Sequence, residues 1–164
     1  MSTTASTICE APQSLHILIV VASLSGNTRE VGRMIAQRCR QAGHAVHWQE
    51  ADTDAASPPL AAARADLLLL GCWTDNAGRT PAEMKAWVAR HATDVAALPG
   101  VAVFGTGETQ WGQEYYCGAV HRLVRYFGSP HPALEIEQMP HGQRDAWAVE
   151  GWTDSVLQRC RRAT

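Results

Sequence analysis

The chain has 164 residues, of which 46% are hydrophobic and 18% are charged, and its formal net charge at pH 7 is −2. These values indicate one globular domain with enough chain to bury a sizeable core. The weak negative charge and the lack of a Lys/Arg run disfavour a nucleic-acid-binding protein. Every apolar run is far shorter than the ~20 residues that span a bilayer, so no membrane association is expected.

The N-terminal segment Met1–Ser14 is polar and lacks the basic start and apolar stretch of a secretory signal. We expect residues 1–14 to be a disordered tail and residues 15–164 to form a single domain. The 5 cysteines lack a CxxC pair and metal-ligand spacing, which favours reduced thiols in a cytoplasmic protein, and the 7 scattered histidines suggest no metal site. The cysteines are Cys9, Cys39, Cys72, Cys117 and Cys160.

Strand and helix patterns alternate along the rest of the chain. Strands are expected at Leu15–Ala22, Ala45–Glu50, Asp66–Cys72, Val101–Gly105 and Ala133–Gln138. Helices are expected at Thr28–Ala42, Pro81–His91, Glu114–Phe127 and Gln143–Arg162, with a short Ala-rich helix at Ala55–Ala65. The second and fifth strands alternate polar and apolar residues, as edge strands do, whereas the others are continuously apolar. The pattern predicts an α/β fold with a doubly wound, five-stranded parallel sheet.

A sheet of this kind binds its ligand beyond the carboxyl ends of its strands, so the loops after the first, third and fourth strands should meet. The first loop offers three hydroxyl groups, one amide, and a glycine that lets backbone N–H groups close on an oxyanion. Its residues are Ser23, Leu24, Ser25, Gly26, Asn27 and Thr28.

No Lys or Arg lies inside this first loop, which suits the phosphate of a bound cofactor better than a transferring phosphoryl group. The loop matches neither the GxxxxGK[ST] pattern of nucleotide triphosphatases nor the GxGxxG pattern of dinucleotide sites. An ordinary helix cap with a turn is the alternative interpretation.

The other two loops carry large flat side chains among glycines. Their candidate site residues are Trp73, Thr74, Asp75, Asn76, Ala77 and Gly78 after the third strand, and Gly105, Thr106, Gly107, Glu108 and Trp111 after the fourth. Together with the first loop they predict a site for an aromatic ring that bears a phosphate. Stacking on a ligand is favoured for Trp111, whereas core packing on the following helix is favoured for Tyr115 and Tyr116.

These loops resemble those of the flavodoxins, and the likeness extends over about Leu15–Cys160. The segment Ser23–Thr28 is similar to the family's [ST]-x-T-G-N-T phosphate loop, with Ser25 in place of the usual Thr. The segment Gly105–Glu108 resembles the G-x-G-D that opens the loop after the fourth strand. The segment Glu114–Val120 resembles the E-Y-F-C-G-A-V run of the short-chain members.

The resemblance implies the flavodoxin-like strand order 2-1-3-4-5 and a single, non-covalently bound FMN. By position, Ser23–Thr28 would bind the FMN phosphate, Trp111 would stack on the outer face of the ring, and Gly105–Glu108 would approach the pyrimidine end through backbone groups. The remaining candidate cofactor residues are Tyr115, Tyr116 and Cys117. The implied function is a monomeric electron carrier that passes single electrons between a flavodoxin/ferredoxin reductase and acceptor proteins in transient complexes.

The chain departs from the family pattern in two ways. Family members commonly carry a tryptophan where this chain has Asp75, and here Trp73 comes two residues earlier. The turn Asp75–Gly78 replaces the family's W-G-D turn, whose peptide flips on flavin reduction, and we expect a flip among its last three residues. The chain is also only weakly acidic and places Arg29 and Arg79 near the expected site, which predicts a milder low potential than is typical.

Two flavin-binding alternatives remain. The first is an FMN-dependent NAD(P)H reductase, which would need a nicotinamide site, and the sequence shows no second nucleotide loop. The second is an activator flavoprotein of a metalloenzyme such as ribonucleotide reductase, which the Gly-rich loop around Trp111 leaves open. A phosphorylation-controlled receiver module would share the strand order but needs acidic residues where this chain has Ala22, Ser23, Gly71 and Cys72.

Overall fold

The computed structural model describes residues 13–52 and 64–163. Five parallel strands form one sheet in the order β2-β1-β3-β4-β5, as the sequence predicts. The strands are β1 (His16–Ala22), β2 (Ala45–Glu50), β3 (Leu67–Trp73), β4 (Val101–Gly107) and β5 (Leu134–Glu137). Residues 1–12 of the expected tail, and all but the last two residues of the expected helix Ala55–Ala65, lie outside the described residues.

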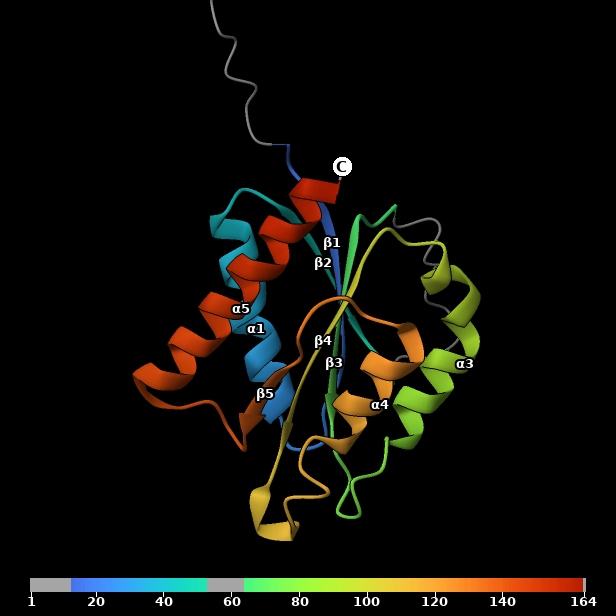
Figure 1. Cartoon of the computed structure of the whole chain (residues 1–164), viewed down its shortest axis with the longest axis vertical. Coiled ribbons are helices and arrows are strands. Elements are labelled where there is room, and N and C mark those ends of the chain that lie inside the picture. Colours follow the sequence, from blue (N-terminus) through green and yellow to red (C-terminus); the bar gives the residue numbers. More distant parts are fainter. Residues whose placement is uncertain (1–12, 53–63, 164) are drawn as a thin grey trace, which may run out of the picture.

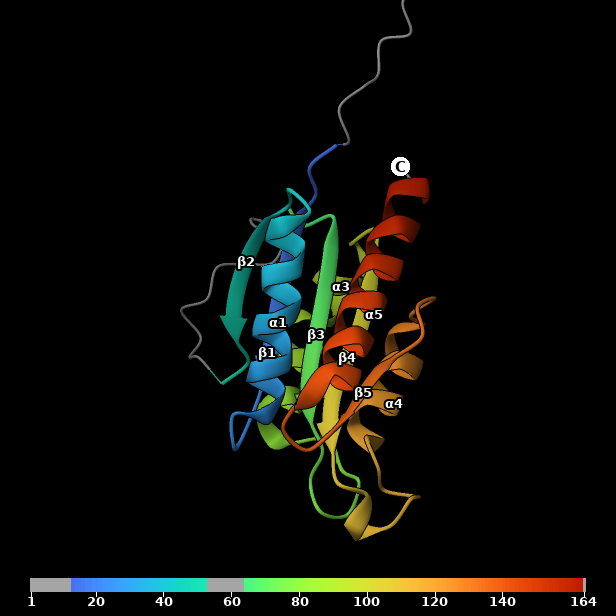
Figure 2. The ribbon, with the colours of Figure 1, turned by 90° about the vertical axis from the view of Figure 1, so that its left-hand side faces the viewer.

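Helices cover both faces of this sheet. They are α1 (Asn27–Gln41), α3 (Ala82–Ala96), α4 (Gly118–Phe127) and α5 (Gly142–Ala163), with a short 3-10 helix η1 (Thr109–Trp111). In Figure 1 the sheet is seen on edge, with α1 and α5 on its left and α3 and α4 on its right. Figure 2 shows α1 and α5 on the near side of the sheet, and these two helices contact each other.

The side chains of the central strands point alternately into two cores. In β1, Ile17 and Ile19 belong to the core under α1 and α5, while Leu18 and Val20 belong to the core under α3 and α4. All four are almost wholly buried, and burying each large aliphatic side chain contributes roughly 1.5–3 kcal/mol. Strands β2 and β5 are the edges of the sheet and are only partly buried, which confirms the prediction from their alternating sequences.

Three element boundaries differ from the prediction by more than one residue, each for a local reason. Strand β4 continues past Gly105 to Gly107, because its last residues pair with the end of β5. Helix α3 continues past His91 to Ala96, since no glycine or proline interrupts it there. Helix α4 begins only at Gly118, because Cys117 has φ 50°, in the left-handed region where a right-handed helix cannot continue.

The close packing of β3 on β4 depends on a glycine. A Cβ atom at Gly71 would lie 2.3 Å from Cζ of Phe104, a wholly buried ring. We therefore expect Gly71→Ala to lower the free energy of unfolding by about 1–3 kcal/mol through overpacking. In the matched control Gly151→Ala, nothing lies within 4 Å of the added atom in α5.

The control should raise the free energy of unfolding by about 0.5–1 kcal/mol, because alanine favours helix over glycine. Urea-induced unfolding of the wild type and the two variants measures both values. Equal effects of Gly71→Ala and Gly151→Ala would contradict the packing proposed for β3 and β4.

Three histidines are buried and have lowered pKa values. Burial is the main cause of the lowered pKa at His44, His91 and His131, and a nearby arginine adds to it in each case. Nδ1 of His44 also accepts the backbone N–H of Leu15 at 3.1 Å, which requires an unprotonated nitrogen. The folded protein therefore takes up fewer protons than the unfolded chain as the pH falls through about 6.5.

This difference predicts acid destabilisation. The free energy of unfolding should fall when the pH is lowered from about 7.5 to about 5.5, because the unfolded histidines gain protons that the folded ones do not. The substitution His44→Asn keeps an acceptor atom near the position of Nδ1 but does not titrate, so the fall should become shallower. Denaturant unfolding at a series of pH values measures this slope, and an unchanged slope in the variant would refute the assignment to His44.

Candidate functional site

A pocket of about 170 Å³ opens at the carboxyl end of the sheet, where the loops after β1, β3 and β4 meet. These loops lie at the lower end of the molecule in Figures 1 and 2. The pocket is lined by Leu24, Ser25, Asn27, Trp73, Thr74, Asn76, Thr106, Gly107, Glu108, Trp111 and Gln138. All of these except Gln138 are among the site residues predicted from the sequence.

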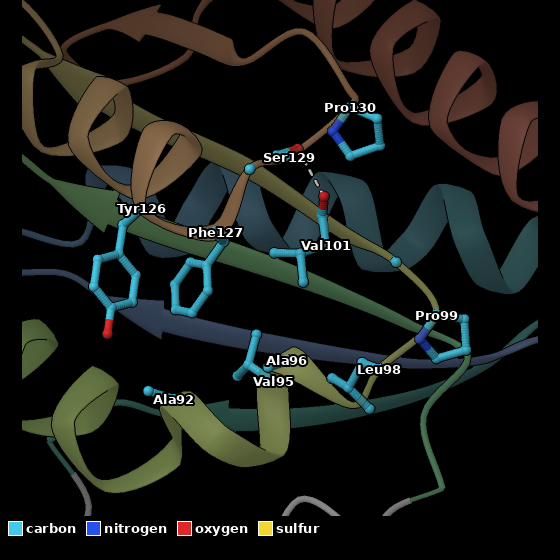
Figure 3. A pocket seen from close by; sticks show the side chains of 12 residues that line it. Ala92, Val95, Ala96, Leu98, Pro99, Val101, Tyr126, Phe127, Ser129 and Pro130 are labelled. Atoms are coloured by element: carbon cyan, nitrogen blue, oxygen red, sulfur yellow. Dashed lines mark hydrogen bonds between the residues drawn. The ribbon is translucent and has the colours of Figure 1, made fainter.

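A larger hollow, of about 380 Å³, lies at the opposite end of the sheet between the C-terminal ends of α3 and α4 (Figure 3). Most of its lining residues have apolar side chains, with Leu98, Pro99 and Phe127 among them. The hydroxyl of Ser129 donates to the carbonyl oxygen of Val101 at 2.7 Å, so that donor is already used. The C-terminal ends of two helices, which carry partial negative charge, border this hollow, and its lining includes no Lys or Arg, so it does not suit a phosphate.

The start of α1 has the backbone donors that an anion site requires. Gly26, the residue before the helix, has φ 97°, a conformation that glycine adopts at little cost, and no side chain caps the helix. In the described part of the chain, no acceptor is bonded to the backbone N–H groups of Gly26, Asn27 or Thr28. Unpaired N–H groups at a helix start carry partial positive charge, so they can bind a phosphate.

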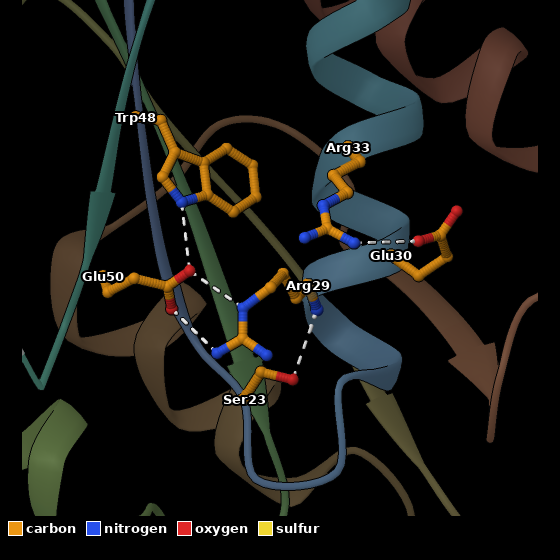
Figure 4. A network of polar contacts seen from close by, with 6 residues as sticks. All are labelled: Ser23, Arg29, Glu30, Arg33, Trp48 and Glu50. Atoms are coloured by element: carbon orange, nitrogen blue, oxygen red, sulfur yellow. Dashed lines mark hydrogen bonds and ion pairs between the residues drawn. The ribbon is translucent and has the colours of Figure 1, made fainter.

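The positive charge nearest to this loop is already neutralised (Figure 4). Nε of Arg29 donates to Oε1 of Glu50 at 2.8 Å, and a second nitrogen donates to Oε2 at 3.1 Å. Burial raises the pKa of Glu50, but hydrogen bonds from Arg29 and Trp48 outweigh it and the net pKa is lowered. Oγ of Ser23 accepts the backbone N–H of Arg29 at 3.3 Å. The donors that the loop leaves available are therefore neutral, and Ser23 closes the loop onto the helix.

Two indole rings line the pocket, and a carboxylate holds each of them. Nε1 of Trp73 donates to Oε1 of Glu83 on α3 at 2.7 Å. Nε1 of Trp111 donates to Oε2 of Glu108 at 2.8 Å, and the Trp111 side chain remains 52% exposed. These bonds orient flat apolar surfaces beside the phosphate loop, an arrangement that suits a ring system joined to a phosphate.

The turn after β3 is closed by its own hydrogen bonds. The backbone N–H of Asp75 donates to the carbonyl of Arg79 at 3.1 Å, and the N–H of Gly78 donates to the carbonyl of Asp75 at 2.7 Å. The side chains of Asp75 and Arg79 also form an ion pair at 3.0 Å. Among the described residues, neither the carbonyl of Asn76 nor the N–H of Ala77 has a hydrogen-bond partner. The Asn76–Ala77 peptide is therefore unconstrained within an otherwise fixed turn.

The residues before α4 support these loops from behind. Cys117 is buried, burial raises the pKa of its thiol to about 12, and Tyr116 packs in the same core. Tyr115 precedes the helix and is 42% exposed, so the predicted core position of Tyr115 on a helix is wrong. Its Cα would lie 3.1 Å from a Cβ at Gly78, which shows how closely the two loops approach.

Several predicted site residues thus lie near the pocket without lining it. They are Ser23, Gly26, Thr28, Asp75, Ala77, Gly78, Gly105, Tyr115, Tyr116 and Cys117. Gln138 is a lining residue that the sequence reasoning missed; it has φ 52°, and its N–H donates to the carbonyl of Gly107 at 2.9 Å. Its place directly after the carboxyl end of β5 was the available signal.

Within residues 13–52 and 64–163, no group of three or more His, Cys, Asp or Glu side chains could hold a metal ion. No helix in these same ranges is long and apolar enough to cross a membrane. The described cysteines are free thiols, while Cys9 lies outside the described residues.

The contact between the turn after β3 and α4 yields a prediction. A Cβ at Gly118 would lie 2.5 Å from the carbonyl oxygen of Gly78, so Gly118→Ala must push the turn away. We expect faster hydrogen exchange at the hydrogen-bonded amides of Asp75 and Gly78, measured by NMR. Gly151→Ala is the control, and unchanged exchange in both variants would contradict the contact.

Comparison with known proteins identifies the family. The family model for flavodoxin matches residues 19–129. The flavodoxin of Nitratidesulfovibrio vulgaris (strain DSM 19637 / Miyazaki F) is 30% identical over 150 residues, which cover 87% of this chain and 97% of that protein.

Solved structures agree with this match. Oxidised flavodoxin 2 from Bacillus cereus has a TM-score of 0.73 and 25% identity, over 87% of this chain and 98% of its own. A short-chain flavodoxin associated with a bacterial microcompartment has a TM-score of 0.74 and the same fold, at 20% identity over 89% of this chain and 99% of its own. The chain belongs to the flavodoxin family.

Proposed function

We propose that this protein is a monomeric, cytoplasmic carrier of single electrons, which holds one FMN and moves electrons from a reductase to acceptor proteins. FMN is the cofactor of the family, and the family and fold support an FMN-binding electron carrier. The observation that carries the proposal is the convergence of a neutral anion site and two oriented indoles on one pocket. The donors fit a phosphate and the flat indole surfaces fit a planar ring, so together they suit a planar ring that bears a phosphate.

The roles of the residues follow from their positions. The free N–H groups at Gly26–Thr28, with the side chains of Ser25 and Asn27, would hold the phosphate. Trp73 and Trp111 would flank the ring and exclude water from it. When bound, FMN supplies reversible electron transfer, and the protein supplies binding and electrostatics.

The charges beside the pocket would tune the affinity for electrons. Glu108 lies in the lining, and its carboxylate opposes additional negative charge nearby. Asp75 and Arg79 neutralise each other through their ion pair. Arg29 is likewise paired with Glu50, so the carboxylates of Glu83 and Glu108 supply the net charge beside the two indoles. The milder potential for the second electron, expected from the weak acidity of the whole chain, stays a prediction.

The turn after β3 contains the element that can respond to a change in ring charge. Rotating the Ala77–Gly78 peptide would break the hydrogen bond that the N–H of Gly78 donates to the carbonyl of Asp75. Rotating the next peptide, Gly78–Arg79, would break the hydrogen bond that the carbonyl of Gly78 accepts from the Arg122 side chain. The Asn76–Ala77 peptide breaks no hydrogen bond of the described residues when it turns. We therefore assign the expected flip to this peptide.

Exposed apolar side chains near the pocket suit brief contact with redox partners. Leu24 is 73% exposed and lines the pocket, as does the exposed Trp111, while Tyr115 lies on the supporting turn. A small apolar patch with a polar rim is typical of transient complexes.

Anaerobic stepwise reduction of the FMN-loaded protein tests the proposed function. We expect strong long-wavelength visible absorbance when about one electron per flavin has been added, because a carrier of single electrons takes up the first and the second electron at separate potentials. NADPH alone should leave the flavin oxidised. Direct two-electron reduction, above all by NADPH alone, would favour the reductase alternative.

Trp111 should contribute strongly to cofactor binding. We expect Trp111→Ala to weaken FMN binding roughly 5- to 150-fold, since stacking a ring on an aromatic side chain contributes about 1–3 kcal/mol. Trp147 is 66% exposed on α5 and does not line the pocket, so Trp147→Ala is the matched control. Fluorescence titration with FMN measures both, and equal losses in the two variants would exclude a stacking role for Trp111.

A further inference from the structure

Two threonine hydroxyls from distant parts of the chain meet beneath the pocket. Oγ1 of Thr28, in the first turn of α1, lies 2.7 Å from Oγ1 of Thr106, near the end of β4. The two side chains are almost wholly buried, at 0% and 5% exposed. We propose that Thr106 is a positioning residue for the phosphate site. Its hydroxyl donates a hydrogen bond to Oγ1 of Thr28, and this bond leaves the hydroxyl of Thr28 to donate its own proton in a hydrogen bond to the FMN phosphate.

The proton count of the pair supports this direction. Each hydroxyl has one proton and can accept further hydrogen bonds. One proton joins the two oxygens, and no other partner binds either hydroxyl among the described residues. One of the two hydroxyl protons therefore has no acceptor among the described residues. A buried donor without an acceptor is unfavourable, so this proton is available to a bound ligand.

An anion at the start of α1 would decide which hydroxyl keeps that proton. Thr28 is one of the three residues whose N–H groups are free, so its hydroxyl lies at the same helix start. A hydrogen bond to an anion is stronger than one between neutral groups, so Thr28 would donate to the phosphate. Thr106 must then be the donor within the pair, and each bond strengthens the other.

Rigid elements hold both hydroxyls in place. Thr106 is paired with Trp73 of β3 on one side and with Ile136 of β5 on the other. The first turn of α1 is tied to the end of β2 by the ion pair between Arg29 and Glu50 (Figure 4). The contact therefore joins the phosphate loop to β4 across the sheet with little freedom to rearrange.

This arrangement changes the role of Thr106. The resemblance assigns Gly105–Glu108 to the ring through backbone groups, whereas the side chain of Thr106 is committed to Thr28. Thr106 then favours the phosphorylated flavin over riboflavin, which has no phosphate. The inference rests on the proposed FMN site.

The test compares two ligands across four proteins. Dissociation constants for FMN and for riboflavin are measured by fluorescence titration for the wild type, Thr106→Val, Thr106→Ser and Thr153→Val. Thr153 is a buried threonine whose hydroxyl donates to the carbonyl of Val149 at 2.7 Å in α5, so it is a matched control. Far-ultraviolet circular dichroism checks that each variant is folded.

We expect Thr106→Val to weaken FMN binding about fivefold, the value of one lost hydrogen bond, and to leave riboflavin binding unchanged. Thr106→Ser should restore the wild-type ratio of the two constants, and Thr153→Val should leave both constants unchanged. Equal losses for FMN and riboflavin in Thr106→Val would overturn the proposal, as would no loss for either.

A double-mutant cycle separates action through Thr28 from an independent effect. On a Thr28→Val background, Thr106→Val should cause no further loss of FMN affinity, because the acceptor of its proton is gone. Additive losses would overturn the positioning role. Failure of the wild type to bind FMN would instead contradict the proposed function, which keeps the two results distinct.

Discussion

The unpaired backbone N–H groups at the start of α1 are the feature on which the rest of the site depends. They exist because β1 is buried on both faces and ends in a short loop, and because Gly26 turns the chain directly into the helix. Arg29 bonds to Glu50 and does not enter the loop, so the site attracts an anion through dipoles alone. A site of this kind binds a cofactor phosphate without the cation that phosphoryl transfer requires.

The remaining walls are held in position by contacts of a different kind. Gly107 and Gly118 allow backbone approaches that a side chain would prevent, and carboxylates orient the two indole rings. In the turn after β3, as the structure describes it, the Asn76–Ala77 peptide is the one without a hydrogen-bond partner. A pocket held by hydrogen bonds, with one peptide free to turn, suits a protein that changes the charge of its cofactor without releasing it.

Periodicity and loop composition predicted much of this structure. Continuous apolar runs marked the inner strands, and alternation marked β2 and β5 as edges. The strand–loop–helix pattern placed the start of α1 correctly, and the loop before it is the one that we propose for the phosphate. The left-handed conformation of Cys117, which delays α4 and displaces Tyr115, has no local sequence signal because non-glycine residues rarely adopt it. The anchoring of Trp73 by Glu83 and the pairing of Thr28 with Thr106 depend on tertiary packing between separate elements, which periodicity does not encode.

The most direct test of the central claim is a titration of the flavin-free protein with FMN, followed by flavin fluorescence. Binding of one equivalent with strong quenching is the predicted result, because the phosphate loop and both indoles act on the same molecule. Riboflavin should bind more weakly, since it leaves the N–H groups of α1 unpaired. Absence of FMN binding, or equal affinity for the two flavins, would contradict the account.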